Sequence, residues 1–339
     1  MRRRPMRVVE GEPHAGHGYV VRPGTPVAMT TCSGRSIRCG VNGIPNIPNI
    51  PGLKKFAGEV LHSSVFVDGS AYAGKSILVI GSCSSGHDIA QELYKCGGEV
   101  VLVQRSPTTV TSVGPDAAGR IYALYSEGLS TEDCDLLAVS IAAPTLRRSH
   151  QRLTREWCRQ DRELLAGLED AGFCWDYGED STGWQWKFLR HGGGFYLNVG
   201  CSDLIVDGQV KVIQFADIAE FTSDGIALGD GGALAVDVIV LATGYHTQQA
   251  LVRKLFGDDV AERIGPIWEF DAEDELRNMW KRTAQPGLWY SAGSFAQCRI
   301  FSKFLALQIK ACELHLLPLA RDEAIPAGRL RAIDLTDVG

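Results

Sequence analysis

Paired cysteine motifs are absent from this sequence, although it contains ten cysteines. None of them stands in the C-x-x-C spacing that holds structural zinc or carries out disulfide exchange, so neither kind of site is predicted. Apolar runs approaching the roughly 18 residues of a membrane span are lacking as well, and no secretory leader is recognisable. These absences predict a cytoplasmic protein with reduced thiols and without a membrane span.

Positive charge is also in short supply. The chain has 34 Lys and Arg residues against 40 Asp and Glu residues, which gives a formal net charge of -6 over 339 residues. Proteins that bind nucleic acids carry a basic face that neutralises phosphates. The acidic balance therefore argues against nucleic acid as a partner.

Glycine, in contrast, is plentiful, with 38 residues, as in α/β nucleotide-binding folds. The short apolar run Ser76–Ile80 predicts a buried parallel strand. A helical spacing of apolar residues follows, with Ser84 or Ser85 as the expected N-cap. The run Glu99–Gln104 predicts a second strand, so the segment has the length and order of one βαβ unit.

The turn between the first strand and the helix is Gly81-Ser82-Cys83-Ser84-Ser85-Gly86. It has the G-x-G-x-x-G spacing of dinucleotide-binding loops, with cysteine in place of the second glycine. In such loops the backbone amides and the helix dipole hold a diphosphate, which makes this turn a predicted cofactor site. Two interpretations of Cys83 stay open: its side chain pushes the diphosphate outward, or the small thiol is accommodated.

The residues at the end of the second strand indicate which nicotinamide cofactor binds. A site for NAD places Asp or Glu here to bond the ribose hydroxyls, but this chain has Gln104-Arg105-Ser106. A guanidinium group and a hydroxyl suit a 2′-phosphate, so NADPH is the predicted cofactor. The alternative is that Arg105 is an ordinary exposed arginine after a strand.

Several motifs in this order resemble those of the flavin-containing monooxygenase family. They are the F-x-G-x-x-x-H-x-x-x-(Y/F) fingerprint at Phe56–Phe66, the A-T-G-Y motif at Ala242-Thr243-Gly244-Tyr245, and the final flavin-side segment at Gly287–Tyr290 and Gln297–Gln308. The resemblance runs from about residue 43 to residue 318. It implies an α/β, Rossmann-like flavoprotein with two dinucleotide-binding domains.

The resemblance also implies a reaction. In this family NADPH reduces bound FAD, the flavin captures O2 as a C4a-hydroperoxide, and one oxygen atom passes to a small organic substrate. It adds Ala242, Thr243, Gly244, Gln297 and Arg299 to the expected cofactor-binding residues. Catalytic residues stay unassigned.

Three polar residues near these motifs are candidates for catalysis by residue type, but no catalytic role is predicted for them. His62 of the fingerprint is interpreted as a structural or positioning residue rather than a general base. His87 and Asp88, at the start of the predicted helix, are interpreted as surface and capping groups.

The chain departs from the family pattern in its first 80 residues. No strand followed by a G-x-G-x-x-G loop, the expected FAD site, precedes Gly81. We therefore predict an incomplete FAD domain: residues 1–71 as its remnant with a proline-rich linker, 72–247 as the NADPH-binding domain, 248–318 as the C-terminal part of the FAD domain, and 319–339 as a tail.

Two functions remain open at this point. The first is the NADPH- and FAD-dependent monooxygenase, and the alternative is a non-catalytic NADP(H)-binding homologue or fragment that lacks FAD. In the second case the flavin-side segment would expose apolar surface, and the chain is then expected to form oligomers.

Overall fold

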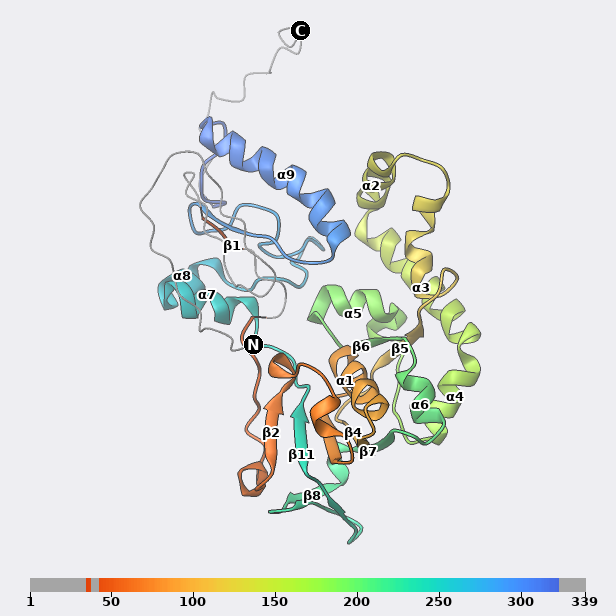
Figure 1. Ribbon diagram of the computed structural model, residues 1–339. Coiled ribbons are helices and arrows are strands. Elements are labelled where there is room, and N and C mark those ends of the chain that lie inside the picture. The colour runs from red at the N-terminus through yellow and green to blue at the C-terminus, as the bar shows by residue number, and fades with distance from the viewer. Residues whose placement is uncertain (1–34, 38–42, 323–339) are drawn as a thin grey trace. The chain divides into compact units, whose positions relative to one another are not determined.

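The computed structural model describes residues 35–37 and 43–322 and divides into two compact units (Figure 1). The central unit comprises residues 45–245. The flanking unit comprises residues 1–44 and 246–339. The predicted tail beyond residue 322 and most of the chain before residue 43 lie outside the described residues.

A parallel five-stranded sheet organises the central unit. Its order is β2 (Glu59–His62), β11 (Val238–Leu241), β3 (Ser76–Ile80), β4 (Glu99–Gln104) and β7 (Lys211–Gln214). Strands β3 and β11 are buried along almost their whole length, as expected for a parallel sheet that is covered on both faces. The fingerprint segment contributes β2 to this sheet.

The predicted βαβ unit is confirmed as β3, α1 (Ser84–Lys95) and β4, with β3 and β4 in parallel register. The predicted N-cap is wrong, because Cys83 occupies the N-cap position of α1, and its side chain makes no capping hydrogen bond. Ser84 Oγ instead donates to the carbonyl oxygen of Phe195 at 3.0 Å. A serine can bond a neighbouring strand as well as its own helix, and here the tertiary partner prevails.

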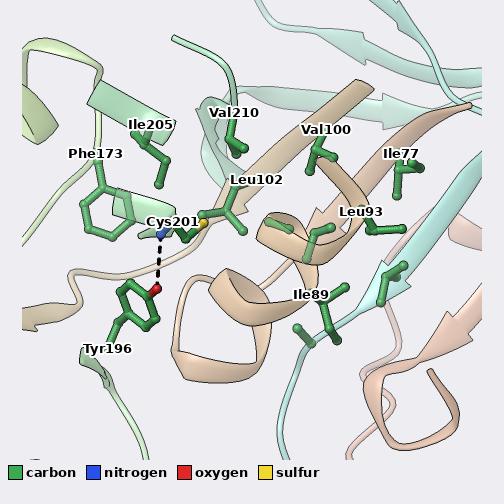
Figure 2. Packing of buried hydrophobic residues seen from close by; sticks show 14 of the residues in the cluster. Ile77, Ile89, Leu93, Val100, Leu102, Phe173, Tyr196, Cys201, Ile205 and Val210 are labelled. Carbon is green, nitrogen blue, oxygen red and sulfur yellow. Dashed lines mark hydrogen bonds between the residues drawn. The ribbon is translucent and has the colours of Figure 1, made fainter. Parts of the chain in front are cut away.

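One hydrophobic cluster joins α1 to the sheet (Figure 2). Ile77 and Leu102 from the strands meet Leu93 of α1, and all three side chains are at most 1% exposed. Phe173 and Ile205, from later in the chain, complete the same cluster. This packing holds α1 against β3 and β4.

The rest of the central unit consists of helices, a small parallel pair and an antiparallel meander. The helices are α2 (Thr131–Ser140), α3 (Ala143–Gln160), α4 (Arg162–Asp170), α5 (Gly183–His191) and α6 (Cys201–Val206). The pair is β5 (Thr109–Ser112) with β6 (Phe195–Asn198), and the meander is β8 (Ile218–Phe221), β9 (Gly225–Leu228) and β10 (Ala233–Ala235). Short 3-10 helices lie at Leu53–Lys55, Ser63–Val65, Ser70–Tyr72, Ala118–Ser126, Glu179–Ser181 and Phe215–Asp217.

The flanking unit contains the parallel pair β1 (Arg35–Ile37) and β12 (Leu288–Tyr290) and the helices α7 (Gln248–Phe256), α8 (Asp258–Ile264) and α9 (Phe295–Glu313). Helix α9 begins with a capping box, in which Ser294 and Gln297 bond each other's backbone amides. Within the described ranges, no helix has both the length and the apolar character needed to cross a bilayer.

Candidate dinucleotide-binding site

The carboxyl ends of β3 and β11 mark the point where the strand order of the central sheet reverses. From β3 the chain continues through α1 to β4 on one side, whereas β11, on the other side of β3, is the last strand of the sheet in the sequence. Ile80 of β3 lies opposite Leu241 of β11. Open α/β sheets bind ligands in the crevice outside such a switch point, so the residues after these two strands form the candidate site.

Two glycines of the loop stand where a side chain does not fit. Gly81 has a φ of 122°, and a Cβ atom on it would lie 2.3 Å from the carbonyl oxygen of Ala242. A Cβ atom on Gly86 would lie 1.8 Å from the carbonyl oxygen of Gly81. The first and third glycines of the motif therefore allow the tight turn and the close packing that the sequence pattern predicts.

The N-terminus of α1 faces the end of β3 with its own backbone donors. The first amides of a helix have no partner within it, and the Cys83 side chain leaves them uncapped. No acidic residue stands in the first turn, which comprises Ser84 to His87. A 12-residue helix with this terminus is suited to an anion.

Cys83 itself is half-buried. Burial is the main reason why the pKa of its thiol is raised above the ordinary value, so the side chain is uncharged at neutral pH and does not repel phosphate. The neighbouring Ser82 is buried, and its hydroxyl shares a 2.9 Å hydrogen bond with that of Thr108. The loop is thus tied to the segment that follows β4.

The three residues at the end of β4 have different environments. Gln104 is fully buried, and its side chain donates to the carbonyl oxygen of Cys174 at 2.7 Å and accepts from the amide of Cys174 at 2.7 Å. Arg105 and Ser106 are exposed. The two hydrogen bonds of Gln104 thus tie the end of β4 to Cys174. The side chains of Arg105 and Ser106, which follow, are accessible to solvent.

Lys187, which the sequence analysis did not identify, lies beside the same turn. It comes from α5, is only 9% exposed in its side chain, and its Nζ is 2.8 Å from both carboxylate oxygens of Asp176. The same Nζ is 3.4 Å from the carbonyl oxygen of Pro107. No local pattern could have revealed it, because Lys187 is 80 residues from this turn in the sequence.

The A-T-G-Y segment is held by hydrogen bonds to the segment that enters the central unit. Thr243 Oγ1 donates to the carbonyl oxygen of Asn46 at 2.6 Å. The buried His62 accepts from the Ser64 amide at Nδ1, so its Nε2 carries the proton and donates to the carbonyl oxygen of Gly244 at 3.0 Å. Burial lowers the pKa of His62, which favours this neutral form.

The other two predicted cofactor residues belong to the flanking unit. Gln297 uses its side-chain oxygen to accept from the Ser294 amide at 2.9 Å, and Arg299 is an exposed residue two positions further along α9. Gln297 therefore has a structural role at the helix start, whatever else it binds.

The interpretation of His87 as a surface group is wrong. Its side chain is fully buried, with its ring stacked on Tyr196 at a centroid distance of 3.9 Å. Asp88 is exposed, as expected. The sequence could not show the burial of His87, because the ring that covers it comes from β6.

Burial of histidines makes the stability of the protein depend on pH. Burial lowers the pKa of both His87 and His150 from 6.5 to about 4. The unfolded state therefore binds more protons than the folded state between these values, and stability is lost as the pH falls from about 6.5 to about 4. We expect the free energy of unfolding, measured by urea titration, to fall across this window, and a variant with both His87→Phe and His150→Phe to show a flatter profile. An unchanged slope in that variant would contradict this origin of the pH dependence.

Comparisons with known proteins agree with this geometry. A family model described as flavin-binding monooxygenase-like matches residues 27–132. Indole-3-pyruvate monooxygenase YUCCA1 of Oryza sativa subsp. japonica is 29% identical over 223 residues, which are 66% of this chain and 49% of that protein. FAD-containing monooxygenase EthA of Mycolicibacterium smegmatis is 28% identical over 225 residues, which are 63% of this chain and 42% of that protein. This chain is related to the flavin-dependent monooxygenases.

Solved structures of flavin-dependent monooxygenases share the fold. An open crystal structure of cyclohexanone monooxygenase matches with a TM-score of 0.50 and 16% identity, covering 83% of this chain and 63% of that one. OTEMO in complex with FAD and NADP matches with a TM-score of 0.50 and 15% identity, covering 84% and 62%. The predicted α/β, two-dinucleotide-binding flavoprotein class is confirmed. The chain spans about half the length of the curated relatives it matches.

Proposed function

We propose that this chain carries the NADPH-binding part of an NADPH- and FAD-dependent monooxygenase that inserts one oxygen atom from O2 into a small organic substrate. The main support is the switch point of the central sheet, where Gly81 and Gly86 are packed without room for a side chain and the α1 amides are uncapped. When bound, NADPH supplies the hydride and FAD supplies the oxygen chemistry. The residues of this chain bind and orient the cofactor.

The donor set fits NADP(H). The diphosphate would be held by the amides at the start of α1, in the way that anions bind at helix N-termini. The 2′-phosphate would be held by Arg105 and Ser106, which are exposed at the end of β4. No carboxylate stands at the end of β4 to repel that phosphate, because Gln104-Arg105-Ser106 occupy the place of the acidic residue.

We assign the remaining predicted cofactor residues by the same resemblance. Ala242, Thr243 and Gly244 directly follow β11 at the switch point, and the carbonyl oxygen of Ala242 occupies the space that a side chain on Gly81 would need. Residues 248–318 of the flanking unit are proposed to be part of the flavin-binding domain, with Gln297 and Arg299 at the start of α9 as contacts. We assign the glycine loop between β3 and α1 to NADPH.

Isothermal titration of the purified chain with NADP+ and with NAD+ tests the nucleotide assignment. We expect NADP+ to bind at least tenfold more tightly, because only NADP+ carries the phosphate that Arg105 would recognise. An absorbance spectrum recorded before and after incubation with FAD tests the flavin assignment independently. Equal affinity for both nucleotides, or no binding of either, would overturn the NADPH assignment.

A further inference from the structure

His87 occupies a position in the first turn of α1 where a buried histidine needs an explanation. Its ring is fully inaccessible to solvent and is stacked on Tyr196 with an interplanar angle of 13°. Phe173 contacts it edge-on at 5.5 Å. Burial of an imidazole costs free energy unless its polar atoms are used, so the hydrogen bonds of this ring are informative.

The Nδ1 atom of His87 lies 3.3 Å from the carbonyl oxygen of Cys83. Because a carbonyl oxygen only accepts, the proton of the neutral ring is on Nδ1. The Nε2 atom is buried and has no hydrogen-bond partner among the described residues. The backbone amide of His87 donates to the same Cys83 oxygen at 3.0 Å, so this one carbonyl accepts from both donors of His87.

The Cys83 carbonyl controls the direction of an amide in the candidate site. It belongs to the same planar peptide group as the amide of Ser84, and in a trans peptide the two groups point in opposite directions. The backbone amide of His87 holds the Cys83 oxygen toward the helix, and the ring Nδ1 adds a second donor to it, so the N–H group of Ser84 points away from the helix. This is the direction in which an anion at the helix N-terminus lies.

Tyr196 keeps the His87 ring in place. Its hydroxyl oxygen accepts from the amides of Val199 and Cys201 at 3.2 and 3.3 Å, and the second of these bonds is drawn in Figure 2. The preceding residue of β6, Phe195, accepts from the Ser84 hydroxyl. The start of α1 is therefore fixed to β6 at two residues, Ser84 and His87.

We propose that His87 is a positioning residue for the diphosphate of the bound dinucleotide, acting through the peptide group between Cys83 and Ser84. This inference rests on the proposed function, in which the loop binds NADP(H). It predicts a selective role: His87 matters for the diphosphate and not for the 2′-phosphate, which lies at the end of β4.

Two substitutions separate the hydrogen bond from the stacking. His87→Phe keeps an aromatic ring against Tyr196 and removes the donor, whereas His87→Asn removes the ring and keeps an N–H group at the position of Nδ1. We expect His87→Phe to weaken NADP+ binding about tenfold in isothermal titration. Binding of adenosine 2′-monophosphate, which lacks the diphosphate, is expected to stay within twofold, and His87→Asn to restore NADP+ binding to within about threefold.

The outcomes discriminate between the alternatives. Equal weakening of both ligands, or no rescue by His87→Asn, would mean a merely structural role and would overturn the inference. Unchanged NADP+ affinity in His87→Phe would overturn it as well, while leaving the proposed function intact. If the unmodified chain binds no NADP+, the proposed function and the inference both fail. Thermal unfolding of each variant confirms that a folded protein is titrated.

Discussion

Replacement of Arg105 by alanine is expected to weaken NADP+ binding by roughly 10-fold to 100-fold and to change NAD+ binding less than twofold. The reason is that a hydrogen bond to a charged group contributes about 1.5–3 kcal/mol, and only NADP+ carries a phosphate on the 2′ position. Arg105 is exposed at the end of β4, so its loss should leave the fold unchanged. The measurement is a pair of isothermal titrations for wild type and variant.

Arg159→Ala provides the matched control, because Arg159 is another exposed arginine of the central unit and lies near the end of α3. It is expected to leave both affinities unchanged. If Arg105→Ala weakens NADP+ and NAD+ equally, Arg105 does not recognise the 2′-phosphate, and the alternative of an ordinary surface arginine is correct.

The features of the site that could be predicted from the sequence are those formed by residues close together in the chain. The strand, the glycine spacing and the helix of the βαβ unit are set by residues close together in sequence, and the structure has all three. The turn Asp230-Gly231-Gly232 between the antiparallel strands β9 and β10 is local in the same way, with Gly231 at a φ of 89°. Short-range patterns of apolar residues and glycines contain enough information for these features.

The part that the sequence did not predict depends on distant residues. The proximity of Lys187 to the turn after β4 depends on how α5 packs, and the burial of His87 depends on Tyr196, which is more than 100 residues away in the chain. The missing cap on α1 has the same cause, because the hydroxyl of Ser84 bonds Phe195 of β6 instead of its own helix. In each case a tertiary contact overrides a local preference.

Gly86→Ala is expected to weaken NADP+ binding more than tenfold and to lower the free energy of unfolding by about 1–3 kcal/mol. The added methyl group would lie 1.8 Å from the carbonyl oxygen of Gly81, whereas real Cβ atoms essentially never come within 3.0 Å of a neighbour. Helix α1 must therefore move away from β3, and its amides move with it. Urea unfolding and isothermal titration of the same preparation measure both effects.

Gly114→Ala is the matched control variant for this prediction. Gly114 also lies in the central unit, and a Cβ atom on it would meet nothing within 4 Å, so this variant is expected to match wild type in both measurements. Loss of stability in Gly86→Ala with undiminished NADP+ affinity would show that the nucleotide does not use the start of α1. The steric requirement for glycine would then be a property of the βαβ packing alone, and the assignment of this loop as the cofactor site would fail even though the fold is as described.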